Sequence, residues 1–267
     1  MRKNLLKIFL ILGAMSVVFI ACKKDAAVTE KKQQISQDVL NKIYALGFSN
    51  KNVQLHDEGY LVEGDIVITE EQLNTKPESI FLRIAGEEQY RTTNTVTGLP
   101  RNITIRVSSS LPSRYITATD AAIARYNAQG LRITMSRVTS GGNIVIRSAP
   151  SGAGYLASSG FPSSSGNPYG SVLMNRSFLD TWNINTVTSI VAHEVGHAIG
   201  FRHTDFMNRA FSCGGSPVNE GASSVGAILI PGTPSGPDSG SWMLACIGNG
   251  TNRPFNTNDR TALAFVY

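Results

Sequence analysis

The chain has 267 residues, and its 42% hydrophobic content is enough for a packed core in one large or two modest domains. The net charge of +5 is spread as single arginines, which argues against a nucleic-acid partner. Residues 1–94 carry 12 basic and 12 acidic side chains, whereas residues 95–267 carry 12 and 7, and every lysine lies at or before Lys76. This break in composition predicts two modules.

The first 22 residues predict a targeting segment rather than folded structure. A basic start at residues 2–7 precedes an apolar run at residues 8–21, which is too short for a comfortable membrane span. The sequence Phe19-Ile20-Ala21-Cys22 resembles a bacterial lipobox, with Phe19 in place of the usual Leu. We expect an exported lipoprotein whose contact with the membrane is a lipid anchor at Cys22, at the outer membrane or the cell surface. A plain secretory signal is the alternative.

The next part of the chain predicts a small module without a catalytic motif. Residues 23–34 are polar and charged, which is typical of a tether, and residues 35–47 have helical apolar spacing. Residues 61–68 predict a strand interrupted by Glu63-Gly64-Asp65, and residues 70–73 a helical turn. Residues 92–100 are small and polar. We therefore expect a tether and prosegment at residues 23–94, with a proteolytic boundary between Arg91 and Arg101.

Residues 95–267 predict the main domain. Strands are expected at residues 103–107, 131–138, 143–147 and 172–174, with a hairpin turn at Gly141-Gly142 and a helix at residues 117–128 capped by Thr117 or Thr119. Residues 149–169 are rich in Gly, Ser and Pro, which favours a long loop lining a binding site. Asn258 is expected to cap a last helix at residues 259–267.

Residues 193–203 carry the chemistry and read H-E-x-x-H-x-x-G-x-x-H. His193 and His197 lie four residues apart, so on a helix both can face one metal ion, and Asn183 or Asn185 can cap that helix. Gly200 can end the helix in the left-handed conformation and let His203 return as a third ligand. Three ligands and a water form a catalytic zinc site.

Export gives the two remaining cysteines a role. Cys213 and Cys246 form an even pair in a non-reducing compartment and lie in the same loop-rich region, which favours a disulfide. Two free buried thiols are the alternative.

The motif and a later methionine resemble the metzincin metallopeptidases. Met243 follows His203 in the sequence Ser241-Trp242-Met243, where a methionine turn is expected, although an ordinary core methionine is the alternative. With Val195 and Gly200, residues 193–205 are most similar to the bacterial dual-action HEIGH metallopeptidases, an astacin-like group, and the similarity covers residues 100–267. This implies an α+β, zincin-like fold: a mixed twisted sheet, an active-site helix, and a loop-rich C-terminal subdomain with Met243 beneath one Zn²⁺.

The resemblance has one departure and one extension. Astacin-like relatives carry a tyrosine two residues after the turn methionine, but this chain has Ala245, so Tyr155 and Tyr169 are candidates for the oxyanion role or are surface aromatics. In the other module, Glu63-Gly64-Asp65-Ile66 resembles the motif by which astacin-type prosegments place an aspartate on the zinc. Asp65 would then be a zymogen latch, unless the segment is an ordinary hairpin turn.

Together these features predict an exported, monomeric zinc endopeptidase made as a zymogen. Glu194 would be the general base for hydrolysis of a polypeptide, which would lie along an edge strand at residues 154–158 or 171–175. The alternatives are a zinc amidase or deacetylase, and a surface lipoprotein that binds zinc only for its fold. Glu194 argues against the last, because a structural zinc site has no use for a carboxylate beside its ligands and usually fills all four positions with protein ligands.

Overall fold

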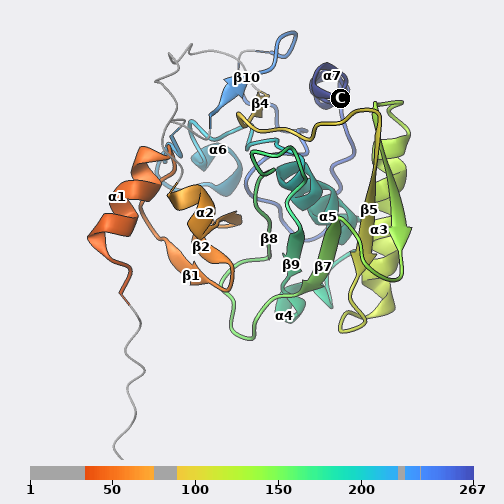
Figure 1. The fold of residues 1–267 in the computed structure, drawn as a ribbon, viewed down its shortest axis with the longest axis horizontal. Coiled ribbons are helices and arrows are strands. Elements are labelled where there is room, and N and C mark those ends of the chain that lie inside the picture. The colour runs from red at the N-terminus through yellow and green to blue at the C-terminus, as the bar shows by residue number, and fades with distance from the viewer. Residues whose placement is uncertain (1–33, 75–88, 222–225, 235) are drawn as a thin grey trace, which may run out of the picture. The chain divides into compact units, whose positions relative to one another are not determined.

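The computed structural model describes residues 34–74, 89–221, 226–234 and 236–267 (Figure 1). The predicted targeting segment with Cys22, and residues 23–33 of the predicted tether, lie outside the described residues. From Ile35 onward the chain forms one compact unit. Within the described ranges, none of the helices combines the length and the apolar character needed to cross a bilayer.

A five-stranded sheet is the centre of the main domain. Its order is β6-β5-β7-β9-β8, with β8 antiparallel to β9 and the other pairs parallel. Ile103 and Ile105 of β5 are buried on one face, while Thr104 between them is half-buried. The strand bounds are β5 (Arg101–Val107), β6 (Ile133–Val138), β7 (Ile144–Ser148), β8 (Ala157–Ser158) and β9 (Ser171–Met174).

Two long helices cover the apolar face of this sheet. Helix α3 (Ser113–Asn127) contacts β5 and β6, helix α5 (Ile184–Ala198) contacts β8 and β9, and the two helices pack against each other (Figure 1). Their inward side chains join those of the strands in one core cluster. The mixed α+β class expected from the sequence is therefore confirmed.

The hairpin predicted at Gly141-Gly142 is wrong. Strands β6 and β7 both pair with β5, in parallel, and lie on opposite sides of it. Their registers are staggered, since β6 pairs with residues 101–106 of β5 and β7 with residues 105–107, so a short connection can cross β5 where one ends and the other begins. Gly142 lies against β5 at the crossing, and a Cβ there would be 3.2 Å from the Cβ of Arg106.

Two predicted helix starts are also wrong. Helix α3 begins at Ser113, after Pro112, without a side-chain cap, and Thr119 instead donates a hydrogen bond to the carbonyl of Tyr115 within the helix. The last helix, α7 (Thr257–Val266), is capped by Asn256 rather than Asn258. Asn256 is the cap because Asp259, three residues later, completes a reciprocal capping box with it.

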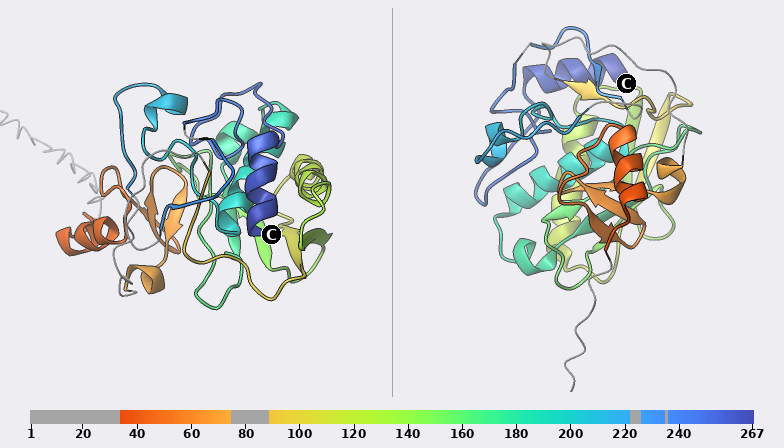
Figure 2. Two further views of the ribbon diagram at one scale, coloured as in Figure 1. Left: turned by 90° about the horizontal axis from the view of Figure 1, so that it is seen from above. Right: turned by 90° about the vertical axis from the view of Figure 1, so that its left-hand side faces the viewer.

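Residues 35–74, here called the N-terminal module, form a small unit with its own core. They contain α1 (Gln37–Ala45), an antiparallel sheet of β1 (Gln54–His56), β2 (Gly59–Val62) and β3 (Ile66–Ile68), and the turn α2 (Glu70–Leu73). Phe161 of the main domain joins their apolar cluster. Figures 1 and 2 show the module in orange beside β8, where Ile66 forms a parallel bridge to Ser159.

The segment predicted as a linker is irregular but packed against the main domain. Just before it, β4 (Tyr90–Arg91) pairs with β10 (Ile228–Leu229). The amide of Thr92 then donates to the carbonyl of Gly200 at 2.8 Å, and the amide of Thr97 to that of Gly166 at 3.0 Å. The remaining short helices are α4 (Arg176–Leu179) and α6 (Ala210–Cys213).

Candidate metal centre and active site

Helix α5 carries the first two histidines of the motif. Its cap is Asn183, whose side chain accepts a hydrogen bond from the amide of Asn185 at 2.9 Å. All residues from position 186 to the end of the helix are buried, so His193 and His197 project from a helix that is fixed by packing on every side.

The helix ends where the sequence predicted, and the geometry explains how His203 returns. Gly200 has φ 108°, the left-handed region that favours glycine. Its amide donates to the carbonyl of His197 at 2.8 Å, and the amide of Phe201 donates to that of Gly196 at 2.9 Å. These two bonds form a Schellman motif, which reverses the chain. A Cβ at Gly200 would lie 2.9 Å from the carbonyl oxygen of Asn94.

All three histidines have their Nδ1 atoms turned away from the centre and bound. His193 Nδ1 is 3.0 Å from the carbonyl oxygen of Trp242, and His197 Nδ1 is 2.8 Å from that of Phe201. His203 Nδ1 is 3.1 Å from the carboxylate of Glu220. Since these partners are acceptors, Nδ1 carries the proton in each ring and Nε2 presents a lone pair.

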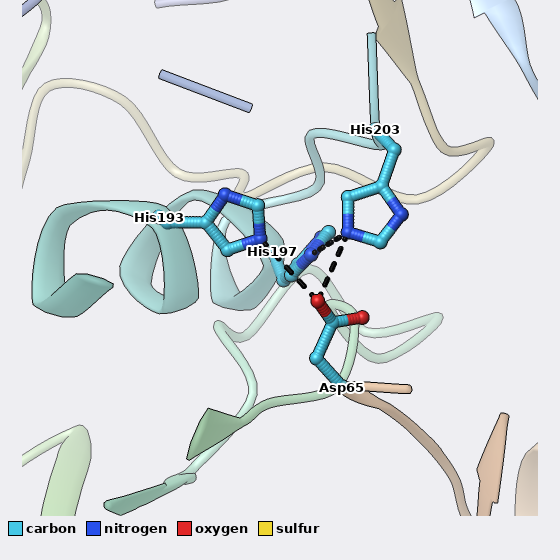
Figure 3. Close-up of side chains that lie close together, drawn as sticks. All are labelled: Asp65, His193, His197 and His203. Atoms are coloured by element: carbon cyan, nitrogen blue, oxygen red, sulfur yellow. Dashed lines mark hydrogen bonds and ion pairs between the residues drawn. The ribbon is translucent and has the colours of Figure 1, made fainter. Parts of the chain in front are cut away.

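The three Nε2 atoms face one point (Figure 3). His197 Nε2 and His203 Nε2 are 3.1 Å apart, although two lone pairs repel at this distance, and the buried Nε2 of His193 has no hydrogen-bond partner in the described chain. Converging acceptors with no donor between them fit a cation. Three imidazoles oriented by outer acceptors are a donor set typical of catalytic zinc.

Asp65 of the N-terminal module is the fourth residue at this point. Its Oδ2 is 3.2 Å from His203 Nε2 and 3.7 Å from His193 Nε2. Glu63 and Gly64, with φ of 56° and 95°, form the turn between β2 and β3 that places it there. The segment is therefore a hairpin turn and also delivers Asp65 to the histidines.

Backbone hydrogen bonds hold the Asp65 segment on the edge of the main sheet. The amide of Ser159 donates to the carbonyl of Asp65 at 2.8 Å, and the amide of Val67 donates to the carbonyl of Ser159 at 2.6 Å. Ser159 directly follows the edge strand β8. Of the two predicted substrate edges, residues 171–175 are wrong, because β9 lies inside the sheet between β7 and β8.

Burial and neighbouring charges shift the pKa values of Asp65, His203 and His197 in different directions. Burial raises the pKa of Asp65, but its interaction with the neighbouring histidines, His203 above all, outweighs this and holds it well below its usual value. Burial lowers the pKa of His203, but Asp65 and Glu220 outweigh that and raise it well above its usual value. Burial, together with the other two histidines, keeps the pKa of His197 well below its usual value.

A buried charge network surrounds the third histidine. Arg202 and Glu63, both fully buried, form an ion pair at 3.1 Å between the main domain and the N-terminal module. Arg209 Nε is 3.1 Å from Glu220, the carboxylate that orients His203, and its Nη1 also donates to the carbonyl of Glu63. Glu63, His203 and Glu220 also lie close enough together to hold a metal ion. Because an arginine pairs with each of the two carboxylates, we interpret this group as an ion-pair network.

Glu194 lies beside the histidines and lines a cavity. Its side chain is buried, and its Oε2 has no hydrogen-bond partner among the described residues. Burial, followed by the charge of Asp65, raises its pKa well above the usual value. The cavity has a volume of about 230 Å³ and lies between α5, residues 154–157 and residues 244–247.

The predicted methionine turn lies directly against α5. Met243 is fully buried, and a Cβ at Gly196 would be 2.6 Å from its sulfur and 2.5 Å from the ring of Trp242. The turn is fixed by Asp259, which accepts hydrogen bonds from Ser241 at 3.0 Å and from the amide of Trp242 at 3.2 Å. The structure thus brings Met243 to the helix turn that lies between the two helical histidines.

The other predicted residues fall in different places. Cys213 and Cys246 form the expected disulfide. Tyr155 lines the cavity, whereas the hydroxyl of Tyr169 donates to Glu58 of the N-terminal module.

Sequence reasoning missed the residues that orient the centre. Glu220, Arg202 and Arg209 come from irregular segments, and no periodicity or motif marks them. Their one signal is position, since Arg202 directly precedes a predicted ligand.

Comparison with known proteins identifies the family. The sequence model described as dual-action HEIGH metallo-peptidase matches residues 60–267, a range that includes Asp65. No curated protein matches the chain. Two solved structures of myroilysin are similar: one at 17% identity covers 65% of this chain and 82% of its own, with a TM-score of 0.42. The other, at 18% identity, covers 66% and 86%, with a TM-score of 0.43. On the extent of the family match, this chain belongs to the dual-action HEIGH metallo-peptidases.

Proposed function

We propose that this protein is an exported zinc-dependent endopeptidase made as a zymogen. The observation that supports this best is the convergence of the Nε2 atoms of His193, His197 and His203, with each Nδ1 occupied by an acceptor. Family membership favours peptide bonds over other amides as the substrate. The three histidines would hold Zn²⁺, which when bound lowers the pKa of a coordinated water toward 7 and polarises a carbonyl group.

Glu194 is the general base of the proposed reaction. Glu194 follows the first ligand on the same helix and lines the cavity, and its Oε2 has no hydrogen-bond partner in the described chain. It takes a proton from the attacking water and returns it to the leaving amine. Burial keeps it out of bulk solvent, so the proton is transferred within the site.

The substrate backbone is proposed to pair with the edge formed by β8 and Ser159. β8 is at the end of the main sheet, and its neighbour Ser159 exchanges two backbone hydrogen bonds with the N-terminal module. An extended peptide could form the same kind of bonds there by strand addition. The N-terminal module and the substrate would then compete for one edge.

Latency follows from the position of Asp65. Its carboxylate lies where a fourth ligand would bind, and zinc accepts carboxylate oxygen. While Asp65 stays there, no water can be held between the histidines and Glu194. Removal of the N-terminal module, by a cut that we expect between Arg91 and Arg101, would therefore generate the active form.

The test is hydrolysis of casein by the zinc-loaded chain after limited proteolysis has removed the N-terminal module, with and without a chelator. We expect activity that the chelator abolishes and that Glu194→Ala lowers by about 10²- to 10⁴-fold while bound zinc is retained, because the ligands remain and only the base is lost. A Glu194→Ala rate within about tenfold of the unaltered chain would contradict the assignment of Glu194. Stoichiometric zinc without hydrolysis of any protein would favour the structural alternative, and release of acetate or ammonia from a non-peptide amide would favour the amidase.

Export and anchoring remain a proposal from the sequence, since Cys22 lies outside the described residues. A basic start, an apolar run and Cys22 support a lipoprotein. Mass spectrometry of the membrane fraction should find a lipid on Cys22, and Cys22→Ala should release the protein. An unmodified N-terminus near Ala21 would instead support the plain secretory signal.

A further inference from the structure

The cavity next to Glu194 has features that the proposed hydrolysis does not use. His193 and Glu194 both line it, so a side chain bound there lies beside the proposed reaction centre and belongs to a residue next to the scissile bond. Its volume of about 230 Å³ is below the range of sites for whole small molecules, about 300–1,000 Å³. It therefore suits one side chain of a bound peptide.

The walls of the cavity are apolar. Ile190 of α5 and Leu244 are buried, and Ile247 packs against the main core. An aliphatic stem would gain hydrophobic contact there.

The polar lining is positively charged. Arg253 lines the cavity and is half-buried, and its Nη1 donates a hydrogen bond to the carbonyl of Cys246 at 2.8 Å. Among the described residues no ion pair joins its guanidinium group to a carboxylate. Burial lowers the pKa of Arg253 and outweighs the more distant charges of Asp205 and Asp259, which raise it. A half-buried guanidinium at a cavity wall favours a carboxylate partner, since charge-assisted hydrogen bonds are the strong ones.

A second arginine of the cavity, Arg209, is hydrogen-bonded to the N-terminal module, which the proposed activation removes. Arg209 also lines the cavity, and it donates to the carbonyl of Glu63, while Gly64 and Asp65 lie beside it as part of the lining. When the N-terminal module leaves, Arg209 keeps Glu220 but loses this acceptor. Without Asp65, the cavity is lined by two arginines, Arg209 and Arg253, and by one carboxylate, that of Glu194.

We propose that this cavity binds an acidic side chain, glutamate before aspartate, at a position next to the scissile bond, with Arg253 as the specificity-determining residue. This rests on the proposed function and adds the substrate class. Glutamate is preferred because its two methylene groups contact Ile190 and Ile247 while its carboxylate reaches Arg253. A lysine in the same place would put like charges together.

The test compares quenched peptides that differ at one position on either side of the cut. The enzyme is the zinc-loaded full chain after limited proteolysis has removed the N-terminal module. Glutamate and glutamine have the same shape, so their ratio of kcat/KM isolates the charge. At one position we expect this ratio to be roughly 10 to 100, the value of a charge-assisted hydrogen bond.

Three variants link the preference to Arg253. Arg253→Gln should bring the glutamate-to-glutamine ratio close to one, Arg253→Lys should restore part of it, and Arg253→Glu should favour lysine. Arg260→Gln is the matched control, because Arg260 is an exposed residue of α7 away from the cavity lining, and it should keep the ratio. Unchanged melting temperatures show that the variants are folded.

The outcomes separate the two proposals. A ratio within about twofold of one in the unaltered enzyme, or a ratio that survives Arg253→Gln, overturns the specificity but leaves the peptidase intact. No hydrolysis of any peptide overturns the proposed function and, with it, the specificity.

Discussion

Asp65→Ala in the full-length chain should raise basal hydrolysis without loss of zinc. The substitution removes the carboxylate that lies 3.2 Å from His203 Nε2 and 3.7 Å from His193 Nε2, but it leaves all three histidines. It also leaves the backbone bonds to Ser159 and the buried pair of Glu63 with the main domain. The N-terminal module therefore stays attached, and only its hold on the metal centre is lost.

The size of the effect follows from the contact removed. We take the hold of the carboxylate on the centre to be worth as much as a charge-assisted hydrogen bond, about 1.5–3 kcal/mol. Since about 1.4 kcal/mol corresponds to tenfold, the population with an open centre should rise by roughly 10- to 100-fold. The initial rate on a quenched peptide should rise by the same factor, and gels should show faster self-cleavage near the predicted boundary.

Asp57→Ala is the matched control for this experiment. Asp57 is an exposed carboxylate of the same module, in the turn between β1 and β2, and its loss should leave the basal rate unchanged. The latch would be refuted if Asp65→Ala bound one zinc per chain and hydrolysed the peptide no faster than Asp57→Ala.

Three further substitutions test the metal centre and its supports. His203→Ala should lose both zinc and activity, as measured by metal analysis and peptide hydrolysis, and one tightly bound zinc in that variant would remove His203 from the centre. Replacing Cys213 and Cys246 together by serine should lower the free energy of unfolding in urea by about 3–4 kcal/mol, given the 33-residue separation, and a change under about 1 kcal/mol would contradict the loop-closure reasoning. Glu63→Ala should destabilise the full chain by about 3–5 kcal/mol because it leaves Arg202 buried without its carboxylate, and Glu63→Gln should cost less.

The part of the site that the sequence predicted is the part encoded over short distances. Asn183, the two helical histidines and Gly200 act within one helix and its end, where spacing translates directly into geometry. The disulfide was predictable because, once export is expected and Cys22 is assigned to the lipid anchor, the two remaining cysteines leave one pairing.

The part that the sequence did not predict depends on contacts between distant segments. Glu220 reaches His203 from 17 residues away on an irregular segment, and Arg202 pairs with a carboxylate 139 residues earlier. The crossover at Gly141-Gly142 is similar, since paired glycines indicate a turn but not which strands it joins. Strand order is set by the packing of the whole sheet, and local pattern does not contain it.

The close approach of Gly196 to the methionine turn bears on how the motif tolerates substitution. The two unspecified positions of H-E-x-x-H differ, because Val195 faces the hydrophobic core and needs only a side chain of suitable bulk, whereas position 196 has no space for a methyl group. Glycine inside a helix costs about 1 kcal/mol relative to alanine. Glycine at position 196 lowers helical propensity but allows close contact with Met243 and Trp242. An alanine there would stabilise the isolated helix and would push both side chains away from it. Because the backbone carbonyl of Trp242 orients the ring of His193, a displacement of Trp242 would also change the orientation of this proposed metal ligand.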